Sequence, residues 1–333
     1  MKEHQSNNIT AFILVGFPTH PKLQPLLFTI FLIIYILTVS ENVVIIVTIR
    51  MNSLLHKPMY YLLCSLSVLE IWYVTVTVPN LLHNILTQNK QINFFACMAQ
   101  LYIFISLACT ECVLLAVMAF DRYVAICIPL HYTDIMSNTC CLCLAVGSWV
   151  LGFSIAMFKV ILIFRSSFCG SNIINHFFCD ISPVLNLACT DVSLAELVDF
   201  ILGMIVTVVP LSIIVITYLC IIRSILKIPK SAGRKKAFST CASHLTVVAI
   251  FFITTFFIYA RPKKISPFDR NKYVSIFYSV LTPLLNPFIY CLRNGEVKES
   301  IKKTLSVRLT NRSMLESLYF SAFRTVHQNY KWM

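Results

Sequence analysis

The chain has 333 residues, of which 58% are hydrophobic and only 12% are charged. Soluble domains carry about 25% charged residues, so this composition excludes a single water-soluble globular core. The net charge of +13 favours contact with anionic lipid or an acidic partner over nucleic acid binding. No charged-then-apolar leader with a small-residue cleavage site opens the chain, so the first apolar segment is expected to act as the insertion signal.

Seven apolar segments reach the roughly 20 residues that a helix needs to cross a bilayer. They cover 26–49, 59–83, 95–121, 140–163, 194–222, 238–260 and 273–292. The sequence therefore predicts an all-α membrane protein, with a seven-transmembrane helix bundle over 26–292. An N-terminal segment, 1–25, would precede the bundle, and a C-terminal tail, 293–333, would follow it on the opposite side of the membrane.

Lysine and arginine predict the orientation, because cytoplasmic loops are enriched in these residues. If the N-terminus is outside, seventeen of the twenty-seven basic residues lie on the inner side. Five of the other ten fall in Arg261–Lys272, which argues locally for the reverse. The balance predicts a multi-pass protein of the plasma membrane with an extracellular N-terminus.

The N-terminal segment 1–25 is polar and is expected to be mobile. Asn8 begins an Asn-Ile-Thr tripeptide, which is a glycosylation acceptor and makes sense only on an extracellular segment. A second such tripeptide begins at Asn311 on the predicted inner side, where it should be unmodified.

Carboxylates inside the spans are the next feature: Glu41 in the first, Glu70 in the second and Glu111 in the third. A charge at the bilayer centre costs at least about 2.5–3.5 kcal/mol, so such groups face the bundle interior and are protonated, paired or bound to a cation. A purely structural role stays open. The sharper hypothesis is that Glu70 and Glu111 share a cation or proton site with Asn286 of the seventh span.

The third span is predicted to end at Asp121-Arg122-Tyr123, an acid and a base side by side. The plain interpretation is a pair of solvated charges at the membrane surface. The fourth span carries Trp149 and is otherwise featureless. After the seventh span, a short amphipathic helix is predicted from Glu296 to Leu305 along the inner surface.

Four cysteines fall on the predicted outer side. Cys169, Cys179 and Cys189 lie in the longest connection, and Cys97 opens the third span. An even set in an oxidising space predicts two disulfides, although four cysteines permit three connectivities. The run from His176 to Asp180, His-Phe-Phe-Cys-Asp, supplies aromatic and polar groups for a lid.

Four motifs, in this order and spread over the spans, resemble the olfactory (odorant) receptors within the rhodopsin-like (class A) G-protein-coupled receptors. They are Pro58-Met59-Tyr60-Tyr61, Met-Ala-Phe-Asp-Arg-Tyr-Val-Ala-Ile-Cys from Met118 to Cys127, Lys-Ala-Phe-Ser-Thr-Cys-Ala-Ser-His-Leu from Lys236 to Leu245, and Pro-Leu-Leu-Asn-Pro-Phe-Ile-Tyr from Pro283 to Tyr290. The resemblance covers about residues 10–305.

The resemblance implies a switch near the cytoplasmic side. Arg122 would be held by Asp121 at rest and released on activation. The other switch and coupling residues would be Tyr123, Tyr218, His244, Asn286 and Tyr290. The resemblance also implies the disulfides Cys97–Cys179 and Cys169–Cys189, and it matches Glu70, Glu111 and Asn286 to a cluster where related receptors bind sodium.

The resemblance further places an odorant pocket among the third, fifth, sixth and seventh spans, under the lid. Its expected lining is Phe104, Ile105, Ala108, Cys109, Leu202, Val206, Phe252, Thr255, Phe256, Tyr259 and Ser279. This apolar and aromatic set with a few hydroxyls suits a small volatile ligand. Asp199, near the outer end of the fifth span, is the one charged candidate and leaves an amine ligand open.

The function that follows is an odorant receptor whose small volatile ligand favours the active bundle, which then activates a heterotrimeric G protein of the olfactory Gs type and raises cAMP. A non-olfactory chemosensory receptor is the alternative within this class. An ion or proton transporter using the intramembrane carboxylates is the alternative from another class, although no internal repeat supports it. No enzyme, cofactor or protein-bound metal centre is expected, because no metal-ligand spacing and no nucleophile, base and acid set occurs.

Overall fold

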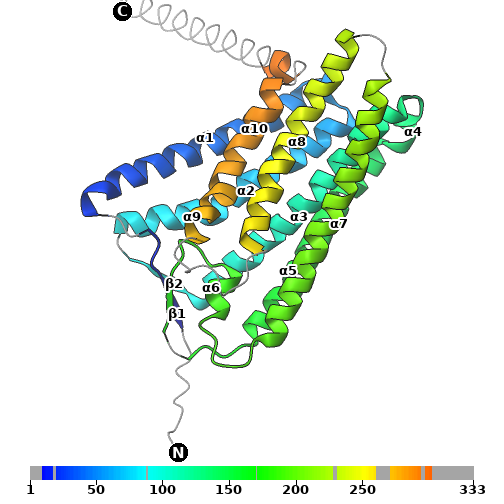
Figure 1. The fold of residues 1–333 in the computed structure, drawn as a ribbon. Helices are drawn as coiled ribbons and strands as arrows, with labels where there is room; N and C mark the ends of the chain where they lie inside the picture. The colour runs from blue at the N-terminus through cyan, green and yellow to red at the C-terminus, as the bar shows by residue number, and fades with distance from the viewer. Residues whose placement is uncertain are drawn as a thin grey trace, which may run out of the picture.

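The computed structural model describes residues 10–17, 20–87, 89–169, 171–227, 231–259, 271–293 and 297–301. Long helices lie beside one another as a bundle (Figure 1). Five of the helices in this part of the chain are long and apolar enough to cross a membrane. They are α1 (Gln24–Met51), α2 (Pro58–Thr87), α3 (Phe94–Cys127), α5 (Asn138–Phe164) and α7 (Ser193–Leu226). The prediction of an α-helical membrane protein is confirmed.

The positions of the other two predicted spans hold shorter apolar stretches. One is Cys241–Phe256 within α8 (Ser231–Tyr259). The other is Phe277–Ile289, which runs through the π-helix η5 (Phe277–Leu281) into α10 (Thr282–Arg293) and follows α9 (Asn271–Ile276). Residues 297–301 are helical, as expected for the start of the amphipathic helix, and the rest of that prediction lies outside the described residues.

The helices extend a few residues beyond the apolar segments, and the difference matters most in α3. This helix continues to Cys127, so Asp121, Arg122 and Tyr123 lie inside it and not at its end as predicted. Asp121 is only 1% exposed, so this charge does not mark the point where the chain meets solvent and the helix ends. Short helical turns follow α3: η3 (Pro129–His131) and α4 (Tyr132–Ile135). The turn η2 (Ser53–Leu55) follows α1. We call the end of the bundle that carries α4 the α4 end.

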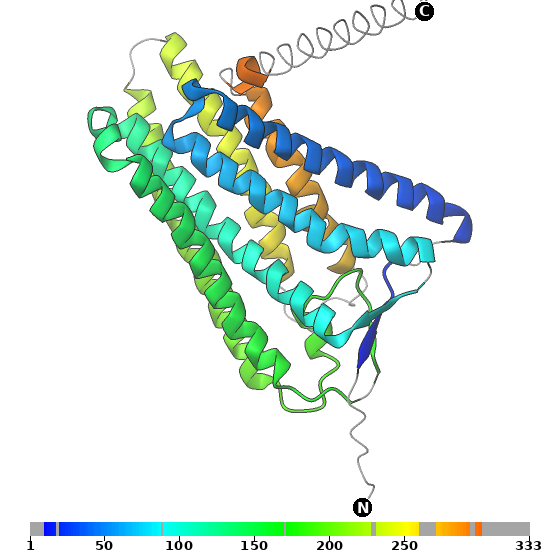
Figure 2. The same ribbon diagram turned by 180° about the vertical axis from the view of Figure 1, so that it is seen from behind.

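A small sheet covers the opposite end of the bundle, which we call the sheet end (Figure 2). Its strands are β1 (Ala11–Leu14), β2 (Gln91–Asn93) and β3 (Ile173–Ile174), in the order β2-β1-β3. β1 pairs antiparallel with β2 and parallel with β3. The expectation that residues 1–25 are all mobile is therefore wrong for β1 and for the turn η1 (Pro21–Leu23). The alternation of exposed and buried positions in β1, with Phe12 and Leu14 buried, is the period expected of a half-buried strand.

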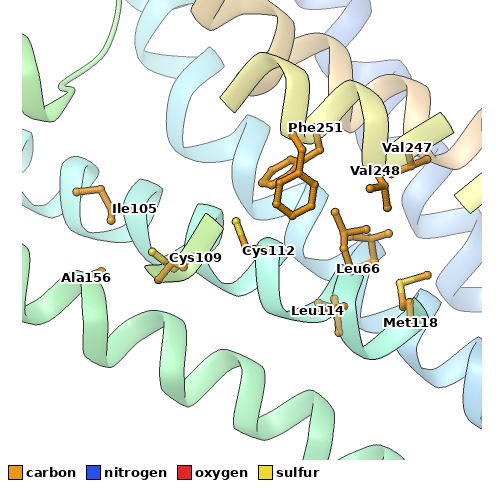
Figure 3. Close-up of a cluster of buried hydrophobic side chains, with 14 of the residues drawn as sticks. Leu66, Ile105, Cys109, Cys112, Leu114, Met118, Ala156, Val247, Val248 and Phe251 are labelled. Carbon is orange, nitrogen blue, oxygen red and sulfur yellow. The ribbon is translucent and has the colours of Figure 1, made fainter. Parts of the chain in front are cut away.

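The helix α3 occupies the centre of the bundle and packs most extensively against α5 and α7. Gly152 makes the α3–α5 approach possible, because a Cβ there would lie 2.8 Å from the Ser106 carbonyl oxygen and closer still to Thr110 Oγ1. Figure 3 shows the buried side chains of α3, from Ile105 to Met118, between α5 and the side where Phe251 of α8 lies. The core thus sets α3 against α2, α5, α7 and α8.

The long connection between α5 and α7 folds back over the sheet end. It contains β3 and the short helix α6 (Ile181–Leu185). Two disulfides fix it, Cys97–Cys179 to the start of α3 and Cys169–Cys189 within the connection. These are the two pairings that the resemblance implies.

Candidate functional site

The segment 175–179, which we call the lid, closes the sheet end of the bundle. His176, Phe177, Phe178 and Cys179 are each at most 2% exposed. The Phe178 ring lies 4.5 Å, between centroids, from the ring of Phe104 on α3. Phe104 in turn contacts Tyr73 of α2 at 5.0 Å and Tyr278 of η5 at 5.7 Å. The lid therefore seals an aromatic layer that joins α2, α3 and η5.

Polar bonds attach the lid to two helices. The Cys179 amide donates to Gln100 Oε1 on α3 at 3.0 Å. His176 Nε2 lies 3.1 Å from the Ser275 hydroxyl on α9, and Lys272 Nζ donates to Asn175 Oδ1 at 3.0 Å. Burial lowers the pKa of His176 to about 3, so the imidazole is neutral at physiological pH.

Asp180 follows the lid directly and caps α6. One of its carboxylate oxygens accepts a hydrogen bond from the Ile181 amide at 2.8 Å. Burial raises the pKa of Asp180 to about 6, and the nearby Asp199 acts in the same direction. Two titratable groups with opposite pKa shifts thus flank Cys179.

Most of the predicted pocket residues lie inside the bundle, with Phe104 in one hydrophobic cluster and Ile105, Cys109, Val206 and Phe252 in another. The buried ones are Phe104, Ile105 and Cys109 of α3, Val206 of α7, Phe252 of α8 and Ser279 of η5, and the half-buried ones are Ala108, Leu202 and Thr255. Phe256 departs from the prediction, because its ring is 64% exposed and the bundle does not enclose it. Tyr259 ends α8, but its side chain lies outside the described part of the structure.

A buried ion pair that sequence reasoning missed lies beside this set. Lys159 Nζ of α5 contacts Asp199 Oδ1 of α7 at 2.9 Å, with the lysine side chain 4% exposed and the aspartate side chain 20% exposed. Cys109 lies within electrostatic range of both groups. Asp199 is therefore already paired with a cation and is not a free acid for an amine ligand. The signal was available, since Lys159 is a charge inside an apolar span.

The intramembrane carboxylates of α2 and α3 meet Asn286 of α10. Asn286 Nδ2 donates to Glu70 Oε1, and Glu111 interacts electrostatically with Glu70. Three buried oxygens have no hydrogen-bond partner among the described residues: Glu70 Oε2, Glu111 Oε1 and Asn286 Oδ1. Hard cations take oxygen ligands, so this donor set fits a cation such as sodium. Glu41 of α1 also has a buried carboxylate oxygen without a partner, and no recorded contact joins it to this cluster.

Asp121 does not hold Arg122 in this structure. Its Oδ1 accepts a hydrogen bond from the Tyr132 hydroxyl of α4 at 2.9 Å, and its Oδ2 is buried without a partner among the described residues. The structure thus shows a hydrogen bond from Tyr132 to Asp121, whereas Arg122, which was expected to pair with Asp121, acts on it only electrostatically among the described contacts. Sequence reasoning missed Tyr132, because only the fold brings α4 back against α3.

The other switch residues meet in part. The Tyr218 hydroxyl of α7 and His244 Nδ1 of α8 are joined by a hydrogen bond of 2.8 Å, and their rings stack. His244 Nε2 is buried without a partner among the described residues. Tyr123 of α3 is half-buried beside Phe120 at 6.3 Å. Tyr290 lies in α10, but its side chain is outside the described part, and so is Asn8.

Comparison with known proteins adds independent evidence. The family described as "Olfactory receptor" matches residues 31–308. The chain is 58% identical to human "Olfactory receptor 6B1" over 91% of its own length and 97% of that protein. It is 55% identical to mouse "Olfactory receptor 6B9", over 90% and 95% of the two chains, and 56% identical to human "Olfactory receptor 6A2", over 91% and 94%.

Proposed function

The chain belongs to the olfactory receptor family, and from that premise we propose which of its residues bind the odorant, switch the bundle and couple it to a G protein. Membership makes the protein a multi-pass membrane protein and an odorant receptor, which is a signalling receptor and not an enzyme. The observation that supports a ligand site beneath the lid is the contact between Phe178 and Phe104, whose ring centroids lie 4.5 Å apart.

The proposed architecture is a seven-helix bundle over 26–292 in the plasma membrane. α8 supplies the sixth span, and α9, η5 and α10 together supply the seventh. The sheet end would be extracellular and the α4 end cytoplasmic, with the tail 293–333 inside. Two disulfides at the sheet end support this orientation, because disulfides persist in oxidising compartments.

The proposed odorant pocket is lined by the buried and half-buried members of the predicted set, without Phe256. A matched pair of variants on α8 tests it: Phe252→Leu should shift the EC50 of an activating volatile, and Phe256→Leu should not. Phe252 is 5% exposed and Phe256 is 64% exposed, so the same change is made inside and outside the enclosed region. Equal EC50 shifts in both variants, at equal surface expression, would move the pocket elsewhere.

The proposed signal output is activation of an olfactory Gs-type protein at the α4 end. Odorant binding would shift the population towards an active bundle in which Arg122 contacts the G protein. A cAMP assay in cells with a panel of volatiles tests this proposal. We expect odorant-dependent cAMP that Arg122→Ala abolishes at unchanged surface expression. Responses that persist in the variant would contradict the role of Arg122, and ion currents without a G protein would favour a transporter or channel.

The cluster of Glu70, Glu111 and Asn286 is proposed as a sodium site that stabilises one state of the bundle. Replacing external sodium by N-methylglucamine should change the EC50 of the wild type. Glu70→Gln and Glu111→Gln should remove this sodium dependence, while Glu41→Gln, which changes a carboxylate with no recorded contact to the cluster, should keep it. Sodium dependence that survives in all three variants would exclude the site.

A further inference from the structure

A cavity of about 40 Å³ lies at the sheet end, away from the proposed odorant pocket. Its walls come from the N-terminal segment, from the start of α1, from the end of α2, from the connection before β2, and from the lid. Most of its surface is apolar, contributed by Leu14, Phe17, Leu27, Leu81, Ile85 and Phe177.

The walls are fixed by contacts between segments that are far apart in the sequence. The Leu14 amide donates to the Lys90 carbonyl at 2.8 Å, and the Gly16 amide donates to the His176 carbonyl at 3.2 Å. Gly16 has a φ of +64°, a conformation that residues with a side chain rarely adopt. The Phe17 ring stacks on Phe177 at 5.2 Å. The walls of the cavity are therefore held in place by the fold of the sheet end.

One polar group in the lining lacks a partner. Asn84 of α2 is 8% exposed, and its Oδ1 is buried without a hydrogen-bond partner in the part of the chain that the structure describes. An unpaired buried acceptor costs about 1–3 kcal/mol, so the site favours an occupant that donates a hydrogen bond. Lys90 also lines the cavity and disfavours a cationic donor. Neutral donors remain, and among them the mostly apolar walls favour a hydroxyl group on a short carbon chain.

Size limits the occupant further. One water molecule needs about 10–15 Å³ of cavity volume. The 40 Å³ of this cavity therefore accommodates roughly three or four non-hydrogen atoms. We infer that this cavity is a second binding site, separate from the odorant pocket, for a short-chain alcohol whose hydroxyl donates to Asn84 Oδ1 and whose carbon chain lies against the apolar walls. The inference goes beyond the proposed function, since the site needs neither an odorant nor a G protein.

Occupancy would reach the odorant pocket through the lid. Phe177 lines the cavity, and its ring lies 4.8 Å from that of Phe178. Phe178 covers Phe104, 4.5 Å away. A filled cavity supports Phe177 from behind and holds the lid closed, so a bound odorant leaves more slowly. The alcohol is then a positive modulator, with an effect of about fivefold on EC50, at the low end of ordinary allosteric coupling.

Binding is tested directly on the purified full-length receptor by saturation-transfer NMR, with 1-propanol as the probe. 1-Chloropropane, which has a similar size and no hydroxyl donor, is the matched ligand control. Propanol should give a saturable signal that Asn84→Leu removes and chloropropane does not reproduce. Asn80→Leu is the matched variant control, because Asn80 lies one turn away on α2 and does not line the cavity. Leu81→Phe, which fills the cavity and leaves Asn84 in place, serves where Asn84→Leu does not fold.

A propanol signal of the same size in all variants would show partition into detergent and overturn the site. A chloropropane signal equal to that of propanol would overturn the role of Asn84, and the absence of any saturable signal would leave the cavity to ordered water only. In cells, 1-propanol should lower the EC50 of an activating odorant about fivefold in the wild type and in Asn80→Leu, and not in Asn84→Leu. Because the NMR measurement needs no odorant response, failure of this site and failure of the proposed function are distinguished.

Discussion

The Tyr132 hydroxyl donates a hydrogen bond of 2.9 Å to the buried carboxylate of Asp121. This contact joins α4, in the connection after α3, to the acid of the Asp-Arg-Tyr motif. It uses one oxygen of a carboxylate that is 1% exposed and leaves the neighbouring Arg122 without a bond to that acid in the described part of the chain. The position of α4 therefore decides whether Asp121 has this hydrogen-bond partner.

Removing this hydroxyl should raise basal signalling. In Tyr132→Phe, the Asp121 carboxylate loses its hydrogen-bond donor, and a hydrogen bond to a charged group contributes about 1.5–3 kcal/mol. Since 1.4 kcal/mol is a factor of ten, the active population should rise roughly tenfold when this bond holds the resting bundle. Basal cAMP per surface receptor measures the effect. Tyr102→Phe, on α3 near the sheet end, is the control. Basal activity at or below that of the wild type would contradict a resting latch.

Breaking the Lys159–Asp199 pair should lower the stability of the receptor, whereas replacing both residues with apolar ones should lower it much less. Lys159→Met or Asp199→Leu alone leaves the other member of the pair without its partner, a change that costs about 3–5 kcal/mol in buried pairs. Each single variant should lower the melting temperature of the purified receptor and its surface expression. The double variant Lys159→Met/Asp199→Leu should recover most of the loss. A double variant as unstable as the sum of the single ones would show that the two side chains act independently.

Gly152 should tolerate no side chain. An added Cβ meets the Ser106 backbone carbonyl at 2.8 Å and lies closer still to Thr110 Oγ1, so α3 and α5 must separate. Overpacking of this kind costs about 1–3 kcal/mol. Gly147→Ala is the matched control on the same helix, because nothing lies within 4 Å of its added Cβ. Thermal unfolding of the two purified variants should show a loss for Gly152→Ala only. A similar melting temperature for both would mean that the helices adjust at little cost.

His176 in the lid and Asp180, which follows the lid, should make stability depend on pH with opposite signs. His176 has a folded-state pKa lowered to about 3, so the unfolded chain binds the proton first and stability falls as the pH drops below about 6.5. Asp180 has a folded-state pKa raised to about 6, so the folded chain binds the proton first and stability rises as the pH drops from about 6 to 3.8. Between pH 6 and 4 the two effects oppose each other.

Single variants should separate these effects. Asp180→Asn should expose the acid destabilisation from His176, and His176→Asn should expose the acid stabilisation from Asp180. The measurement is the melting temperature of the purified receptor between pH 7 and 4, compared with a wild type that changes less than either variant. Identical pH profiles for the wild type and both variants would show that neither group titrates as its burial implies.

Much of the helical core could be predicted from sequence, because a span of about 20 apolar residues is a local property. Five membrane-length helices lie where the apolar segments predict them. The ends were less predictable, since α3 continues past Asp121, which is buried and accepts a hydrogen bond from Tyr132. β1 was missed as well, because a strand of four residues becomes stable only when β2 and β3 pair with it.

The candidate site, like the fold, could be predicted only in part from the sequence. Burial of Phe104, Cys109 and Phe252 agrees with their place on inward faces of periodic helices. The outward position of Phe256, only four residues from Phe252, depends on how α8 is rotated in the bundle, and one helix alone does not specify that rotation. The partners of Lys159 and Asp121 likewise come from other segments, so their charges were visible in the sequence and their pairing was not.

The order of the sheet has a consequence for biosynthesis. β1 is the middle strand, and Asn172 Nδ2, which donates to the Ala11 carbonyl, belongs to a segment made 161 residues later. β1 therefore completes its hydrogen bonds only after the four membrane-length helices α1, α2, α3 and α5 have been synthesised. Until then Phe12 and Leu14 are without the covering that buries them in the finished protein.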